Sequence, residues 1–410
     1  MAIIDEQPVA QQDEISFQRL IGTSIVAKLL VDTGTQIFSP FLSIIAPGLG
    51  TNVVTMGRLL GLRSAMGLFA PYFGVYADRH GYRRTIRLGL LLNVIGMFVI
   101  GASTNVSLAA VGMVATGLGI ACFVPNLHAY LSARLPYSLR ARGLGMVEYS
   151  WALTGIIGLY AVGLVIEVSG WRMPFFILGV GMLIMWYVFG FMPATRTGAP
   201  ERAAISSEIE RPALGRRIRA FLHLGVHARS TYSVIVAGAL NYFAAMQIMI
   251  TYGAWLGTEY MLTPKQLGMI ALVFGFFDLA ASVSVSIFTD QIGKKRSVII
   301  GTVGALLGYI MMPFFNTGVV PAIIGIGIAR GFFEFAIVSN FPLLSEQVPE
   351  QRGKVMTLGT AIGLLGAMVA GFSGPWLYTQ YGVAGMAAAS ILASLLALII
   401  LLTMVQEYGA

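Results

Sequence analysis

Residues 74–84 read Gly74-Val75-Tyr76-Ala77-Asp78-Arg79-His80-Gly81-Tyr82-Arg83-Arg84. A related stretch, Ser286-Ile287-Phe288-Thr289-Asp290-Gln291-Ile292-Gly293-Lys294-Lys295-Arg296, follows 212 residues later with its Asp, its Gly and its basic pair in the same register. Each copy joins two long apolar segments. A charged loop that recurs between apolar segments predicts a membrane protein built from two like halves.

The composition also indicates a membrane protein. Hydrophobic residues make up 57% of the 410 residues and charged residues only 11%, whereas soluble proteins carry roughly 25% charged residues. The single cysteine, Cys122, lies in an apolar stretch, so the chain has no internal disulfide and no CxxC-type metal site. We therefore expect no metal and no cofactor.

Twelve apolar segments are long enough to cross a bilayer, which takes about 20 helical residues. They are 20–46, 54–77, 86–103, 107–132, 142–166, 173–192, 230–256, 265–289, 297–315, 319–345, 354–378 and 383–404. The predicted fold class is an all-α integral membrane protein with two pseudo-symmetric six-helix bundles. The predicted boundaries are an N-terminal tail over 1–19, bundles over 20–192 and 230–404, a linker over 193–229 and a C-terminal tail over 405–410.

The basic residues predict the orientation. Of the 26 Lys and Arg residues, all but six lie in tails and loops on one side, and only Arg172 and Lys265 lie in loops on the other. Basic loops stay in the cytoplasm, so we expect both termini, the linker and the tails to be cytoplasmic in a bacterial-type inner membrane. The net charge of +8 then reflects contact with the lipid bilayer and not with nucleic acid. We expect a monomer.

A second repeated feature supports the duplication. Asn126 and Asn340 lie 214 residues apart near the ends of the fourth and tenth predicted spans. Arg142-Gly143 and Arg352-Gly353 follow them and open the next spans, 210 residues apart. Each half therefore repeats the order of spans and the chemistry of the loops.

On these residues the chain resembles the major facilitator superfamily, of the 12-helix, drug- or sugar-efflux type. The Gly-x-x-x-Asp-x-x-Gly-x-Arg-Arg loop looks like the signature loop of that family, and Trp171-Arg172 before the sixth span also fits. The resemblance covers essentially the whole chain and implies transport by alternating access. The second copy departs from the pattern at Ser286, where the family favours Gly.

The resemblance implies that the two loops act as a conformational latch between the halves, although plain anchoring by arginine is the alternative. A glycine lets helices approach closely, and an aspartate can accept hydrogen bonds at the N-terminus of a neighbouring helix. The predicted latch residues are Gly74, Asp78, Gly81, Arg83, Arg84, Asp290, Gly293, Lys295 and Arg296.

Ionisable residues inside the spans are the candidates for function, because each costs about 2.5–3.5 kcal/mol at the bilayer centre. Lys28 and Asp32, like Arg330 and Glu334, are four residues apart on one helical face. Such pairs either hold helices together or line a central cavity. Asp32 is the first candidate for proton coupling, with Lys28 as its modulator. The others are Glu334, Asp278 and Glu148. His128 could meet Glu148, and Asp278 could reach Arg330.

Other residues are candidates for contact with a solute. Four intramembrane cations, Lys28, Arg58, Arg63 and Arg330, suit an anionic solute. In the seventh span, Asn241 and Tyr242 could donate hydrogen bonds, and Asn126 and Asn340 are further candidates. Ordinary helix packing is the alternative for this polar stripe.

Two marks of the superfamily's drug–proton antiporters are missing. Met113 occupies the place of their arginine four residues before a glycine, and the fifth span has Gly155 and Gly158 without proline. We nevertheless expect a proton-coupled exporter of a small organic or amphipathic solute. The alternative is a proton-coupled symporter of a small organic anion, and a non-transporting receptor is remote. The sequence has no Ser/His/Asp set, metal cluster or phosphate loop, so we do not expect an enzyme.

Overall fold

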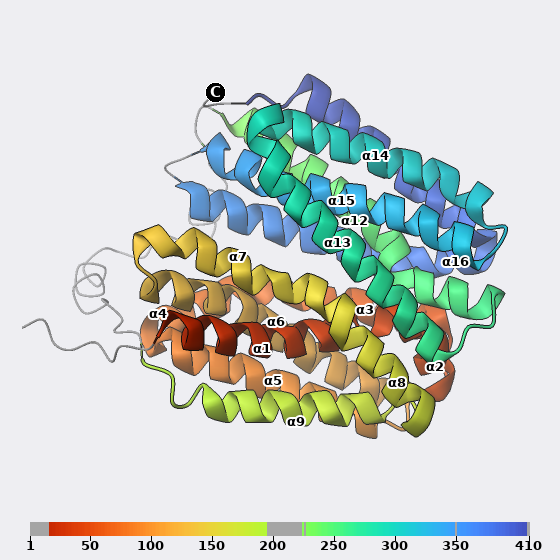
Figure 1. Ribbon diagram of the computed structural model, residues 1–410, viewed down its shortest axis with the longest axis horizontal. Helices are drawn as coiled ribbons and strands as arrows, with labels where there is room; N and C mark the ends of the chain where they lie inside the picture. The colour runs from red at the N-terminus through yellow and green to blue at the C-terminus, as the bar shows by residue number, and fades with distance from the viewer. Residues whose placement is uncertain (1–15, 195–223, 225–226, 349–350, 408–410) are drawn as a thin grey trace, which may run out of the picture.

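The computed structural model describes residues 16–194, 224, 227–348 and 351–407, so most of the predicted linker lies outside the described residues. The described chain forms two bundles of helices (Figure 1). The first contains α1 (Phe17–Gln36), α2 (Phe38–Gly48), α3 (Val53–Ala65), a 3₁₀ turn (Met66–Phe69), α4 (Ala70–His80), α5 (Tyr82–Ala102), α6 (Val106–Arg134), α7 (Tyr137–Leu153), a π-helical turn (Thr154–Leu159), α8 (Tyr160–Ser169) and α9 (Met173–Val188). The second contains α12 (Ala228–Glu259), α13 (Pro264–Ile292), α14 (Lys294–Phe315), α15 (Val319–Gln347) and α16 (Arg352–Thr403).

These helices account for the twelve predicted spans. Within the described residues, nine helices are long and apolar enough to cross a membrane, and the bent pair α1–α2 makes a tenth span. The long helix α16 contains the last two predicted spans, divided at Gly382, whose φ of 62° interrupts the helix. α9 is a shorter apolar helix of 16 residues at the position of the sixth span. The predicted twelve-helix fold is confirmed.

The first and fifth spans are less regular than expected. The predicted first span is two helices that meet at an angle of 51° beside Ile37. Pro40 follows three residues later, and a proline inside a helix removes a backbone hydrogen bond and bends the helix. The fifth span contains the π-helical turn between α7 and α8, a feature that often marks functional sites.

Local sequence signals explain where the helices begin. Asn52 and Asn105 accept hydrogen bonds from backbone N–H groups in the first turns of α3 and α6. Thr263 and Gln266 form a reciprocal capping box at the start of α13, where Pro264 is the first helical residue. These caps satisfy backbone donors that would otherwise lack partners at the ends of apolar helices.

The two repeated loops make equivalent contacts. Arg83 Nη1 donates a 2.7 Å hydrogen bond to the carbonyl of Met192, after the last helix of the first bundle. Lys295 Nζ donates a 2.7 Å hydrogen bond to the carbonyl of Val405, after the last helix of the second. We call the end of the molecule that carries these loops the basic end. The opposite end carries the loops 49–52, 103–105, 170–172, 260–263 and 316–318.

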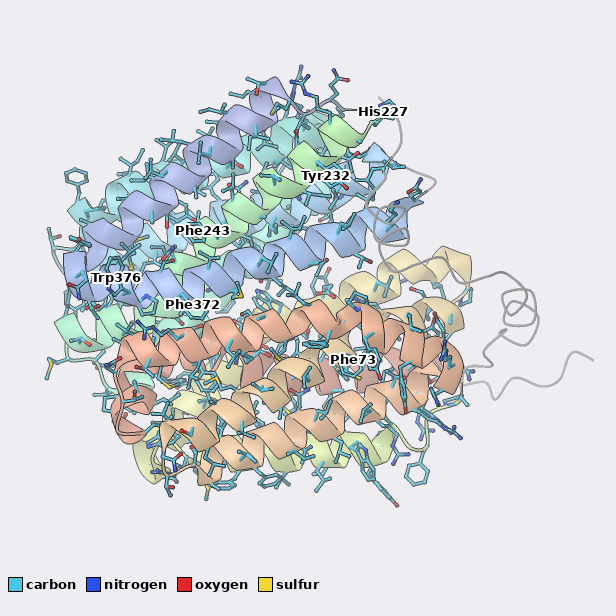
Figure 2. All side chains as sticks on the ribbon, turned by 180° about the vertical axis from the view of Figure 1, so that it is seen from behind. Phe73, His227, Tyr232, Phe243, Phe372 and Trp376 are labelled. Carbon is cyan, nitrogen blue, oxygen red and sulfur yellow. The ribbon has the colours of Figure 1, made fainter. Side chains whose placement is uncertain are left out.

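The two bundles pack closely toward the opposite end. The contacts between them run through α2 and α12, α3 and α16, and α8 with the π-helical turn against α13. A Cβ atom at Gly253 would lie 2.2 Å from the carbonyl oxygen of Ser39, and one at Gly57 would lie 2.6 Å from that of Gly371. Only glycine allows such close backbone approach. In the views from both sides, the two bundles lie side by side, and most of their helices run roughly along the long axis of the molecule (Figures 1 and 2).

Candidate functional site

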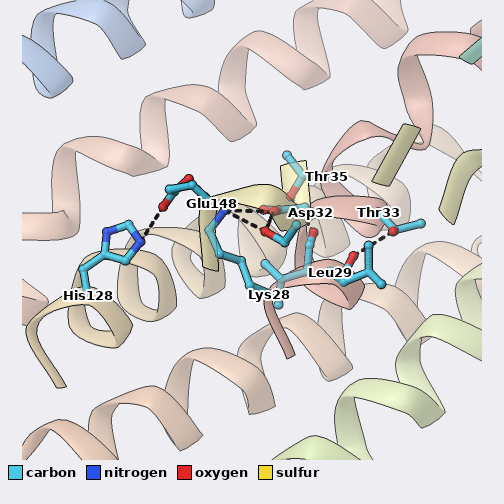
Figure 3. A network of polar contacts seen from close by, with 9 residues as sticks. Lys28, Leu29, Asp32, Thr33, Thr35, His128 and Glu148 are labelled. Carbon is cyan, nitrogen blue, oxygen red and sulfur yellow. Dashed lines mark hydrogen bonds and ion pairs between the residues drawn. The ribbon is translucent and has the colours of Figure 1, made fainter. Parts of the chain in front are cut away.

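A network of buried charges occupies the first bundle (Figure 3). Lys28 and Asp32, one turn apart on α1, form an ion pair with 2.9 Å between Nζ and Oδ2. Ser150 of α7 joins them, because Lys28 Nζ donates to its Oγ at 3.1 Å and this hydroxyl donates to Asp32 Oδ2 at 2.7 Å. The side chains of Lys28 and Asp32 are only 4% and 7% exposed. The expected pairing of Lys28 with Asp32 is confirmed.

The network continues toward an accessible surface. Lys28 Nζ also lies 3.3 Å from Glu148 Oε2, and His128 Nε2 of α6 lies 2.7 Å from Glu148 Oε1. The predicted meeting of His128 and Glu148 is thus confirmed. The side chain of Glu148 is 51% exposed and that of His128 is 35% exposed. We call these five residues, His128, Glu148, Lys28, Ser150 and Asp32, the α1–α7 network.

A second network lies in the other bundle. Arg330 of α15 forms a bidentate contact with Asp278 of α13, at 2.7 Å from Nε to Oδ1 and 2.5 Å from Nη2 to Oδ2. Glu334 follows one turn later on α15, and the hydroxyl of Ser282 donates to its Oε1 at 3.4 Å. We call Asp278, Ser282, Arg330 and Glu334 the α13–α15 network.

The contacts show which of the two neighbouring carboxylates Arg330 pairs with. Asp278 takes the guanidinium of Arg330, as expected for a carboxylate without a partner in its own helix. Among the described residues, the Arg330/Glu334 pair makes no ion pair within 4.0 Å, so only one of the two four-residue spacings forms a direct bridge. The planar guanidinium of arginine can donate two parallel hydrogen bonds to one carboxylate, which favours this bidentate contact.

The two networks have the same formal charge. Each contains one lysine or arginine and two carboxyl groups, so each has a formal charge of −1 when these groups are ionised and His128 is neutral. Neither pattern could be read from helical spacing alone, because the partners come from different spans. Ser150 and Ser282 were not among the predicted site residues, and isolated serines in apolar spans give no distinctive signal.

The remaining two cations behave differently. Arg63 Nη2 donates to the carbonyl of Thr35 at 2.8 Å, and its guanidinium carbon lies 5.2 Å from the ring centre of Phe38. Its Nη1 is enclosed without a hydrogen-bond partner, and no carboxylate of the described residues lies within 4.0 Å. Arg58, on the same helix, is exposed. The structure therefore separates both arginines from the two charged networks.

The predicted polar residues occupy different environments. Asn241 donates to Thr302 of α14 at 2.9 Å, which is a packing contact. Asn126 donates to the carbonyl of Cys122 in its own helix at 2.7 Å. Tyr242 and Asn340 instead line a cavity of about 190 Å³ between α12, α15 and α16, whose other lining residues are mostly apolar. Asn340 Oδ1 is buried without a hydrogen-bond partner.

In the first repeated loop, no neighbouring helix packs closely against Gly74. A Cβ atom at Gly74 would meet no atom within 4 Å, and Asp78 is exposed and accepts a 3.2 Å hydrogen bond from the Tyr82 hydroxyl. Arg84 and Arg296 are exposed as well. In the second loop, the Asp290 side chain lies outside the described residues. The side chain of Lys294 forms an ion pair with Glu346, and the backbone N–H of Lys294 donates a 2.8 Å hydrogen bond to the Glu407 carboxylate.

Comparison with known proteins agrees with this fold. The sequence model of the Major Facilitator Superfamily matches residues 25–232 and 234–408. The uncharacterised MFS-type transporter YceJ of Bacillus subtilis is 25% identical over 356 residues, which are 84% of this chain and 86% of YceJ. YwfA of the same organism is 24% identical over 377 residues, covering 91% of this chain and 89% of YwfA.

Solved structures show the same architecture. The inward-open xylose transporter XylE of E. coli superposes with a TM-score of 0.73 at 17% identity, covering 96% of this chain and 98% of XylE. Proteins of this superfamily are transporters, not enzymes. The match to the superfamily model along both halves shows that this multi-pass membrane protein belongs to the Major Facilitator Superfamily of secondary transporters.

Proposed function

We propose that the protein exports a small organic or amphipathic solute in exchange for protons by alternating access. One observation carries the proposal, namely that the α1–α7 network runs without interruption from the half-exposed Glu148 to the buried Asp32. A carboxylate that is buried but linked to an accessible one can exchange protons with one side of the membrane. This is the property that coupling requires.

The contacts suggest a route for the proton. Lys28 donates to the Ser150 hydroxyl, which donates to Asp32, so a shift along these two bonds delivers a proton to the carboxylate. Lys28 regains its proton from the side of Glu148 and His128. The protonated Asp32 no longer forms an ion pair with Lys28, which changes the energy of the contact between α1 and α7. Coupling follows if only one protonation state favours reorientation of the bundles.

The position of the accessible end follows from the basic loops. We infer that the basic end faces the cytoplasm of a bacterial inner membrane and that both termini lie there, since positively charged loops remain on that side. The close glycine contacts lie toward the opposite end. The described conformation is then closed to the outside, with Glu148 accessible from the cytoplasm.

The names of relatives support export of organic compounds. Multidrug resistance protein 2 of Bacillus subtilis is 23% identical over 261 residues, covering 62% of this chain and 63% of that protein. The quinolone resistance protein NorB of Staphylococcus aureus is 26% identical over 132 residues. The mostly apolar cavity beside Tyr242 suits an amphipathic solute.

Symport of a small organic anion remains the second candidate. A putative tartrate transporter of Agrobacterium vitis is 27% identical over 202 residues. However, Lys28 and Arg330 are already paired with carboxylates. The anion hypothesis therefore rests on Arg63, whose enclosed Nη1 has no acceptor.

Purified protein in liposomes tests the proposal. A thermal-shift screen first identifies a solute that raises the unfolding temperature, because a ligand that binds only the folded state stabilises it. An imposed pH gradient should then drive uphill movement of that solute, with protons moving in the opposite direction, and a protonophore should abolish both. Solute flux that does not depend on the pH gradient would contradict proton coupling. Movement of solute and protons in the same direction would favour symport.

A further inference from the structure

Glu334 is the one carboxyl group of the α13–α15 network that accepts no hydrogen bond from Arg330. Arg330 directs both Nε and Nη2 to Asp278, whereas Glu334 accepts a long 3.4 Å hydrogen bond from the Ser282 hydroxyl. Its side chain is partly accessible. An ionised carboxylate in an apolar region raises the free energy of the protein unless a positive group lies beside it. Glu334 thus provides a carboxyl group whose ionised form a bound cation would stabilise.

Glu334 lies in a network whose carboxyl groups outnumber its cations. Both networks have a formal charge of −1 when their carboxyl groups are ionised and His128 is neutral. Arg330 directs both of its side-chain hydrogen bonds in this network to Asp278. A cation entering from the accessible end is therefore attracted to this region, and an anion is repelled.

An apolar cavity begins one turn along α15 from Glu334. Glu334, Ile337 and Phe341 share one face of α15 at helical spacing, and Ile337 and Phe341 line the 190 Å³ cavity together with Tyr242. The centre of the Tyr242 ring lies 6.0 Å from that of Phe333, the residue that precedes Glu334 on α15. An aromatic face beside a carboxylate is a favourable site for an ammonium group.

We propose that this cavity binds an amphipathic organic cation. Its positive group lies between Glu334 and Tyr242, and its apolar body occupies the space between α12, α15 and α16. The proposal rests on the proposed function only in taking this cation as the transported solute. A sugar fits poorly, because Asn340, Thr360 and Tyr242 are the only polar side chains among the lining residues of this described cavity.

Equilibrium binding without any pH gradient tests the proposal separately from coupling. We would measure thermal shifts and affinities of protein in lipid nanodiscs for benzyltrimethylammonium and tetraphenylphosphonium as cations, phenylacetate as the anion and benzyl alcohol as the neutral compound. At least one cation should bind, whereas phenylacetate should not. Glu334→Gln should weaken cation binding roughly tenfold or more, as expected for loss of a hydrogen-bonded charge.

Matched variants separate charge from folding. Glu334→Asp keeps the charge and should retain binding, and Glu346→Gln removes a carboxylate from the same helix at its basic end and should bind as wild type does. Tyr242→Leu should weaken binding of the cation more than binding of benzyl alcohol. This variant keeps the test valid should Glu334→Gln fail to fold.

Two results would overturn the cation site. One is equal cation affinity in wild type and Glu334→Gln, and the other is binding of phenylacetate in preference to both cations. If these occur while some solute still moves against protons, only the cation site is wrong. If cation binding behaves as stated but no proton moves with transport, the coupling is wrong instead.

Discussion

Gly81 and Gly293 share one backbone conformation, with φ of 89° and 97° and ψ of 142° and 143°. Each residue ends one membrane helix and begins the next, in loops 212 residues apart. This region of backbone space is open to glycine and strained for other residues. The duplicated sequence has therefore kept a duplicated turn, together with the Arg83 and Lys295 contacts that follow it.

Replacing either glycine should destabilise the protein. Gly81→Ala and Gly293→Ala should each lower the free energy of unfolding by about 1–3 kcal/mol, because alanine is strained at this φ. Gly74→Ala is the control, since its added Cβ would meet no atom within 4 Å and its backbone is helical. Thermal unfolding in one detergent compares the three variants. An equal loss at Gly74 would show that the turn conformation is not the cause.

Asp78 should act on the conformational equilibrium and not on the conformation described here. In this structure Asp78 is exposed and bonded to Tyr82, so Asp78→Ala removes little from it. If the loop is a latch for the alternative conformation, the variant should raise the population with an open basic end. Spin-label distances across the basic end measure this population. An unchanged distance distribution would leave Asp78 as a surface residue without a latch role.

The Arg330–Asp278 pair should be strongly coupled. Arg330→Gln leaves a buried carboxylate without its partner and should cost about 3–5 kcal/mol, whereas the double variant with Asp278→Asn should cost less than Arg330→Gln alone. A double-mutant cycle by thermal unfolding measures the coupling. Additive single effects would mean that the bidentate contact is not maintained in the membrane.

Closure of the opposite end should depend on Gly253. Its Cβ position lies 2.2 Å from the carbonyl oxygen of Ser39 in the other bundle, so Gly253→Val should force α2 and α12 apart. Longer spin-label distances across the opposite end, with slower transport, are expected. Gly22→Val is the control, because nothing lies within 4 Å of its Cβ position. If Gly253→Val leaves the distances unchanged, the close contact of α2 with α12 at Gly253 is not what keeps the opposite end closed.

The sequence predicted the fold more fully than the site. Apolar length and the repeated loop were sufficient for twelve spans in two bundles, and helical spacing was sufficient for Lys28 with Asp32. The bend at Ile37, the π-helical turn and the role of Ser150 depend on how the helices pack, which periodicity does not specify. The same applies to Arg330, whose choice of Asp278 over Glu334 is a contact between spans.

The most direct test of proton coupling is solute-dependent proton movement in liposomes that contain the Asp32→Asn variant. This substitution keeps the size of the side chain beside Lys28 and Ser150 but removes its ability to carry a proton. We predict that proton movement is lost while exchange of labelled for unlabelled solute continues. Proton movement at the wild-type stoichiometry in Asp32→Asn would contradict the assignment of Asp32 as the coupling residue.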